Sequence, residues 1–259
     1  MNLYDKLIQE SLNLFTEADL FTLPLADKGP LWQTEIEQRL IFQRDMAYEL
    51  GGGSLPAVSA LAYTSRPAES DKLLLYGPDL PELKADSSYA RLTILHIDDQ
   101  DWQDDQQAYQ LLRQMEYTRY HVYPQGFMMR ISTSAGREPV RVSRKALQNG
   151  LTFARVGQLF LHAYHGHPQV RAATLLFVTA PDFPYELLAQ KASKMEAVTN
   201  SLDQIWNHLI MDCRSCNLKP VCDEVEGLRE LHINSFVKEG HYTEIINCQR
   251  KPLSSLQRR

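Results

Sequence analysis

Short, continuous apolar runs alternate along this chain with longer segments whose apolar positions recur at helical spacing. The runs at residues 58–63, 72–76 and 91–97 are each bounded by Pro, Gly or Asp, as strands commonly are. Residues 174–179 are almost wholly apolar, which predicts a central strand covered on both faces. The pattern therefore predicts at least four strands.

Segments with helical periodicity separate and follow these runs. The predicted helices cover residues 2–17, 33–50, 104–117, 144–165, 184–210 and about 224–236. The second is expected to end at Gly51-Gly52-Gly53, because glycine runs are typical of helix C-termini. A phosphate-binding loop is the alternative interpretation, but it requires a preceding strand and a helix that begins within the loop.

A β-hairpin is predicted between these helices. Pro124-Gln125-Gly126 forms a turn into residues 127–132, and Ala135-Gly136 leads to a second strand at 140–142. Ser143 then caps the next helix. The predicted fold is mixed α/β, with a central mixed sheet flanked by helices. Residues 1–210 form the core domain, and 211–259 form a helical, cysteine-bearing subdomain packed on it.

Composition and charge indicate an ordinary globular protein and argue against nucleic-acid-binding and membrane-spanning classes. The 259 residues are 44% apolar and 23% charged, and their net charge of −5 gives no support for nucleic-acid binding. The N-terminus lacks the basic run and apolar core of a signal peptide, and no apolar run approaches the ~20 residues that span a bilayer. We expect a cytoplasmic protein with no membrane association, in which thiols stay reduced.

The cysteines supply the first candidate chemistry. Three of the four follow the pattern C-x2-C-x5-C at Cys213, Cys216 and Cys222, and Cys248 is the expected fourth ligand, with His232 as a substitute. Thiolates suit a 4Fe–4S cluster or Zn²⁺, and both usually take four protein ligands. The alternative is a set of reduced, unliganded thiols.

A cluster of basic residues supplies the second candidate chemistry. Residues 113–155 hold eight Arg and Lys against two Glu, a local charge of +6. Arginine forks suit phosphate and carboxylate groups, and the hairpin is expected to bring Arg130 and Arg141 onto one face. The alternative is a solvated surface that pairs with the five aspartates of residues 98–105 or with a protein partner. Those aspartates are themselves interpreted as a strand exit and the first turn of a helix.

Two polar clusters are interpreted as structural. His162, His165 and His167 crowd a helix C-terminus, where the helix dipole favours histidine without a metal. The acidic residues after Cys222 are expected to stabilise a helix N-terminus. The chain has no nucleophile elbow, H-E-x-x-H motif or dinucleotide fingerprint, so no catalytic residue is assigned.

Several stretches together resemble one known family. They are Glu-Tyr-Thr-Arg-Tyr-His-Val-Tyr-Pro-Gln-Gly at 116–126, Arg-Val-Ser-Arg-Lys-Ala-Leu at 141–147, Phe-Val-Thr-Ala-Pro-Asp at 177–182 and Cys-Asp-Glu-Val-Glu-Gly-Leu-Arg-Glu-Leu at 222–231. This set resembles the carbon monoxide dehydrogenase/acetyl-CoA synthase β subunit, in the domain that precedes its active-site cluster. The resemblance spans about residues 35–240.

The resemblance implies acetyl-CoA synthesis from a methyl group, CO and coenzyme A on a nickel-containing cluster attached to a 4Fe–4S cluster. It implies CO dehydrogenase, a corrinoid protein or a methyltransferase as partners. It also implies that the arginine-rich stretch, with Arg119, Arg130, Arg141 and Arg144, faces coenzyme A. The family's active-site cluster requires a Cys-Gly-Cys element, which this chain lacks. Whether the chain is an enzyme therefore stays open.

Three functions remain at this point. The first is a stand-alone accessory relative of the β subunit in one-carbon metabolism. The second is an electron-transfer protein with a single iron–sulfur cluster. The third is an interaction domain stabilised by a structural zinc site.

Overall fold

The computed structural model describes residues 3–16, 19–25, 30–34, 40–130, 137–207 and 216–238. The strands are β1 Leu20–Thr22, β2 Met46–Leu50, β3 Ala57–Thr64, β4 Lys72–Tyr76, β5 Tyr89–Ile97, β6 Phe127–Met129, β7 Val140–Ser143 and β8 Val170–Val178. The helices are α1 Asp5–Leu12, α2 Asp105–Tyr120, α3 Arg144–Gln148, α4 Phe153–His165, α5 Tyr185–Trp206, α6 Lys219–Glu224 and α7 Leu228–Lys238. Short 3-10 turns lie at Gln43–Asp45, Leu80–Glu82 and Asp99–Trp102.

Five strands form the main sheet in the order β1-β4-β8-β5-β3. The β3–β5 and β4–β8 pairs are parallel, whereas β5–β8 and β1–β4 are antiparallel, so the sheet is mixed. Strand β8 occupies the middle and is buried along its length except at Arg171. The four strands predicted from apolar runs, and the central place of the last one, are confirmed.

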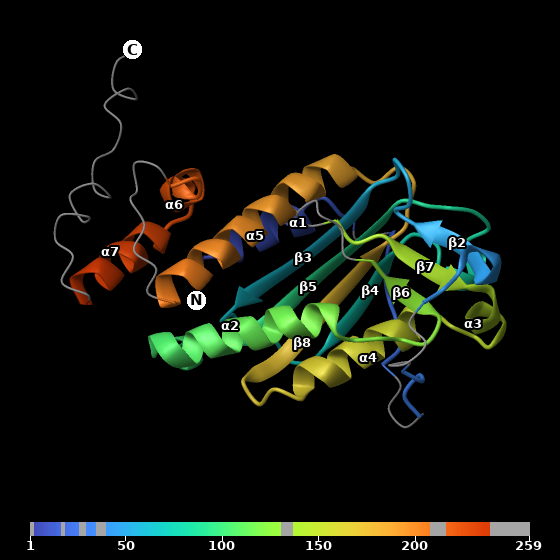
Figure 1. The fold of residues 1–259 in the computed structure, drawn as a ribbon, viewed down its shortest axis with the longest axis horizontal. Helices are drawn as coiled ribbons and strands as arrows, with labels where there is room; N and C mark the ends of the chain where they lie inside the picture. The colour runs from blue at the N-terminus through green and yellow to red at the C-terminus, as the bar shows by residue number, and fades with distance from the viewer. Residues whose placement is uncertain are drawn as a thin grey trace, which may run out of the picture.

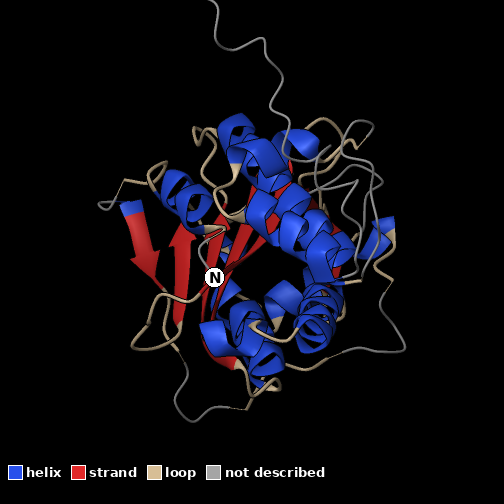
Figure 2. Cartoon of the chain, turned by 90° about the vertical axis from the view of Figure 1, so that its left-hand side faces the viewer, coloured by secondary structure: helices blue, strands red, loops and turns tan. Residues whose placement is uncertain are grey.

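Helices flank this sheet. Helix α4 packs against β4 and β8, while α5 packs against β3 with α1 beside it (Figure 1). Helix α2 contacts both α4 and α5. Figure 2 shows the molecule turned by 90° from Figure 1, with helices above and below the strands of the main sheet. The predicted mixed α/β class is therefore confirmed.

A second, three-stranded sheet has the order β2-β7-β6. Its β6–β7 pair is the predicted hairpin, with Met128 opposite Arg141. The Ser143 side chain accepts a hydrogen bond from the Ala146 N–H, which confirms the predicted cap. The helix predicted over 144–165 is two helices, because Gly150 turns the chain at φ 90° and Thr152 caps α4.

The helix predicted over residues 33–50 is wrong. Residues 43–45 form a 3-10 turn, and residues 46–50 form β2, which pairs with β7. Residues 35–39 lie outside the described part of the chain. Because Tyr48 and Leu50 are both buried, β2 has the alternating pattern of a half-covered strand, and pairing with β7 overrides the local helical spacing.

The glycine run therefore does not end a helix. It turns the chain from β2 into β3, and Gly51 has φ 64°. A Cβ at Gly51 would lie 2.2 Å from the Ala57 Cβ, so only glycine fits this turn. A strand, not a helix, follows the run, so the architecture of a phosphate-binding loop is not formed here.

The C-terminal helices pack against α5. The helix expected over 224–236 corresponds to α7, which begins at Leu228 after Gly227 turns the chain at φ 85°. Helix α6 is not among the predicted helices, because its residues include the end of the cysteine motif. Helices α6 and α7 lie at the opposite end of the molecule from the small sheet (Figure 1). Among the helices of the described ranges, none combines the length and apolar character needed to cross a membrane. The predicted domain boundary at 210–211 lies outside those ranges.

Candidate functional site

Three of the four arginines predicted to face an anionic ligand lie in the small sheet or directly after one of its strands, and Arg144 begins α3. Arg141 lies on β7 and Arg130 directly follows β6. Arg130 donates to Oε1 of Glu49 on β2, and the Arg141 Nε lies 3.6 Å from the same oxygen. The hairpin thus brings both guanidinium groups to one carboxylate. We call Arg130, Arg141, Arg144 and Arg44 the arginine face.

The other hydrogen bonds of these arginines leave their side chains exposed or part-exposed. Arg141 donates to the Ile41 carbonyl at 3.2 Å, and Arg144 donates to the Met46 carbonyl at 3.1 Å. Arg44, with 83% of its side chain exposed, lies over the Phe42 ring. Within the described ranges, the face has four guanidinium groups, and Glu49 and Asp45 are the carboxylates paired with them. Among these residues the positive charges outnumber the negative ones, and a guanidinium has five N–H donors, which suits an anion.

Arg119 lies elsewhere, in the interior. Its side chain is 5% exposed and donates to Glu138 Oε1 at 3.2 Å and to the Ser59 carbonyl at 3.0 Å. Arg91 donates to the other Glu138 oxygen at 2.7 Å. Burial alone would lower the pKa of Arg119, but the Glu138 and Glu116 carboxylates raise it. The structure therefore does not bring Arg119 to the arginine face.

The other basic residues of the 113–155 stretch are dispersed. Arg113 pairs with Asp203 at 3.5 Å, and Arg137 donates to the carbonyls of the glycine turn. Arg155 lies over the Trp32 ring. The acidic segment at 98–105 forms a 3-10 turn, and Asp104 caps α2, as expected for a strand exit and a helix start. Its Asp98 pairs with Arg171, which lies outside that stretch.

The histidines near the end of α4 have separate partners. His165 contacts the Asp71 carboxylate at 2.8 Å, and His167 contacts the Thr118 hydroxyl at 3.0 Å. His162 is exposed. Nowhere in the described ranges do three or more His, Cys, Asp or Glu side chains form a group that could hold a metal ion.

The cysteine motif is only partly described. Cys222 lies in α6, with its Sγ 3.9 Å from the Ser201 Oγ on α5, and Cys216 precedes α6 with its side chain part-exposed. Cys213 and Cys248 lie outside the described residues, and His232 is buried on α7. A 4Fe–4S or zinc site at these thiols therefore stays a prediction. The nickel-containing cluster does not fit this chain, because its four cysteines include no Cys-Gly-Cys element.

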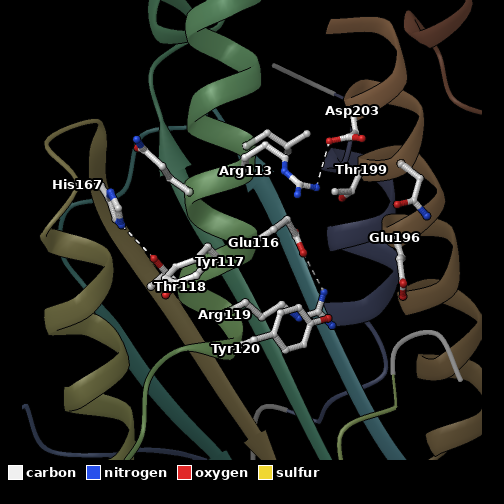
Figure 3. Close-up of a pocket in the computed structure, with 13 residues that line it drawn as sticks. Arg113, Glu116, Tyr117, Thr118, Arg119, Tyr120, His167, Glu196, Thr199 and Asp203 are labelled. Carbon is white, nitrogen blue, oxygen red and sulfur yellow. Dashed lines mark hydrogen bonds and ion pairs between the residues drawn. The ribbon is translucent and has the colours of Figure 1, made fainter. Parts of the chain in front are cut away.

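Sequence reasoning missed a cavity between α2 and α5 (Figure 3). Its volume is about 580 Å³, and its walls include Glu116 of α2 and Glu196 of α5. Tyr63 donates to the Glu116 carboxylate at 3.2 Å, and burial raises the pKa of that group. One signal in the sequence could have indicated this cavity. Positions 196, 200 and 203 of α5 are polar and recur at helical spacing, on a helix whose other faces pack against β3 and α1.

Comparison with known proteins identifies the family. The family model for the CO dehydrogenase/acetyl-CoA synthase complex beta subunit matches residues 32–173, more than half of the chain. A search of curated proteins gave no match. The matched range contains the whole arginine face and ends before the cysteine motif. The chain therefore belongs to the CO dehydrogenase/acetyl-CoA synthase complex beta subunit family.

Proposed function

We propose that this chain is an accessory, β-subunit-like module of one-carbon metabolism that binds coenzyme A, or another phosphate-bearing ligand, at the arginine face. It would act beside CO dehydrogenase, a corrinoid protein or a methyltransferase. Because the cysteines for the nickel-containing cluster are absent, the proposal includes no acetyl transfer on this chain.

The observation that carries the proposal is the convergence of Arg130 and Arg141 on Glu49. Two adjacent strands hold the guanidinium groups around one carboxylate oxygen. A planar fork of N–H donors fixed in this way suits a phosphate, which can replace a carboxylate as acceptor. Glu49 would then act as an internal competitor that keeps the two side chains oriented before the ligand arrives.

Titration calorimetry with coenzyme A tests this proposal. We expect binding that weakens about 10- to 100-fold in Arg130→Ala/Arg141→Ala, because a charge-assisted hydrogen bond contributes about 1.5–3 kcal/mol. Arg171→Ala is the matched control, since Arg171 is an exposed, ion-paired arginine of the main sheet. Absence of binding to the wild type, or an equal loss in the control, would contradict the proposal.

Two further arms separate specific binding from general charge. Pantetheine, which lacks the phosphates, should not bind measurably at this face. Glu49→Gln should tighten coenzyme A binding, because it removes the competing carboxylate while keeping the shape of the side chain. If Glu49→Gln weakens binding instead, Glu49 serves only to hold the sheet together.

A second candidate function rests on Cys216 and Cys222. Both thiols are part-exposed and lie within or directly before one short helix. Helix α6 lies at the opposite end of the molecule from β6, β7 and α3 (Figure 1), so a metal beside α6 would form a site separate from Arg141 on β7. This candidate is an iron–sulfur cluster or a zinc ion held with Cys213 and Cys248.

Metal and sulfide analysis of protein purified without oxygen tests this candidate. About four irons with matching sulfide and a visible band that bleaches on reduction would indicate a 4Fe–4S cluster. One zinc without colour would indicate a structural site, and chelation should then lower the melting temperature sharply. Protein that contains neither metal, and takes up neither on reconstitution, would contradict the candidate.

A further inference from the structure

The cavity between α2 and α5 lies in a different part of the fold from the arginine face and is lined by opposing charged side chains. Helix α2 contributes Glu116 and Tyr120, and α5 contributes Glu196 and Asp203. Figure 3 shows Glu196 on the α5 wall, on the side that faces Glu116 and Tyr120. Its volume of about 580 Å³ is within the range of small-molecule sites.

Among the described residues that line the cavity, the carboxylates of Glu116, Glu196 and Asp203 outnumber two arginine cations. The Arg113 cation is paired with Asp203 at 3.5 Å. The Arg119 cation is shared between Glu138, at 3.2 Å, and Glu116, at 3.6 Å. Glu196 forms no ion pair with another residue of the described ranges. Its Oε2 atom is buried and accepts no hydrogen bond from the part of the chain that the structure describes.

The Glu196 side chain is part-exposed, but its buried Oε2 atom has no donor in the described ranges. A carboxylate oxygen removed from water without a donor is destabilising, and a cation or an N–H group can compensate for it. Burial raises the pKa of the nearby Glu116, Arg119 and the Tyr63 hydroxyl oppose that rise, and the charge of Glu196 adds to it. A cation in the cavity would offset the repulsion between the two carboxylates.

We infer that this cavity binds a small organic cation, with an ammonium or guanidinium group held by Glu196 together with Glu116. Asp203 lies two helical turns further along α5, a rise of about 10.5 Å for seven residues. A linear amine with a second cationic group can therefore span from Glu196 toward Asp203. The Tyr120 ring adds an aromatic wall beside the site, and the Arg119 guanidinium already lies over it, 4.9 Å from its centroid.

Titration calorimetry with spermidine and with agmatine, at physiological salt, tests the inference. We expect 1:1 binding of at least one probe, weakened ten-fold or more in Glu196→Gln. Glu186→Gln is the matched control: it makes the same change of charge at an exposed position of the same helix, outside the cavity lining. An equal loss in both variants would show general attraction to an acidic protein and would overturn the inference.

Two more measurements keep the test decisive if binding is weak. Asn200→Trp should block the cavity without altering any charge, since Asn200 is exposed and lines it. Glu196→Gln, but not Glu186→Gln, should raise the melting temperature of the ligand-free protein and abolish the rise that spermidine causes in the wild type. Wild-type protein that binds neither probe, or an Asn200→Trp variant that binds as well as the wild type, would overturn the inference.

Discussion

At the scale of single residues, two carboxylates organise the arginines of this protein in the same way but at different depths. Glu138 accepts from Arg91 and Arg119 in the interior, whereas Glu49 holds Arg130 and Arg141 near the surface. Breaking a buried pair leaves an uncompensated charge, while a surface pair contributes about 0–1 kcal/mol. The first arrangement therefore specifies the fold, and the second is available to a ligand.

Removing the Glu138 charge should be strongly destabilising. We expect Glu138→Gln to lower the free energy of unfolding by about 3–5 kcal/mol, because two buried guanidinium groups lose their shared negative charge and one of its two acceptor oxygens becomes an NH2 donor. Urea unfolding at neutral pH measures the loss. Asp98→Asn, which breaks a surface pair with Arg171, is the control and should cost at most about 1 kcal/mol. Similar losses in the two variants would contradict the structural role given to Glu138.

At the scale of elements, the spacing between α4 and the main sheet depends on one glycine. Gly157 faces β4 and β8, and a Cβ placed there would lie 2.6 Å from Leu73 Cδ2 and 3.2 Å from Phe177 Cε2. Both neighbours are fully buried, so neither side chain can move into solvent. The absence of a side chain lets α4 lie close to the strands.

Gly157→Ala separates helix propensity from packing. Alanine favours the helix by about 1 kcal/mol, but overpacking a filled core costs about 1–3 kcal/mol. We expect net destabilisation of up to about 2 kcal/mol in urea unfolding. In the Leu73→Ala background the substitution should become neutral or stabilising, because the space it needs is then empty. Stabilisation in the wild-type background would mean that α4 shifts outward freely.

At the scale of the whole molecule, the residues matched by the family model and the residues that build the main sheet are not the same. The match ends at residue 173, inside β8, whereas the main sheet also needs the rest of β8 and its cover by α5. The arginine face lies wholly within the matched range. One wall of the cavity belongs to α5 and lies beyond it. A shared ligand-binding property of the family would therefore map to the face, and the cation site would be specific to chains that carry α5.

Local signals were sufficient where a short segment fixes its own conformation. Short apolar runs bounded by Pro, Gly or Asp predicted β3, β4, β5 and β8, because such bounded runs are typical of strands. Strands β3, β5 and β8 are almost wholly buried, whereas β4 alternates between buried and exposed or part-exposed positions. Turn and cap residues predicted the β6–β7 hairpin and the start of α3, because Ser143 satisfies a helix N–H group from its own neighbourhood.

Long-range contacts decided the rest. Residues 46–50 became a strand because β7 supplies hydrogen-bond partners about 95 positions away, which no local pattern encodes. Arg119 belongs to a basic stretch of the sequence, yet its side chain is buried. It donates hydrogen bonds to Glu138 and to the Ser59 carbonyl, which are distant from it in the sequence. Within the described ranges, the Glu196 Oε2 atom has no partner because Arg113 and Arg119 pair with other carboxylates, and that pairing exists only in the packed molecule.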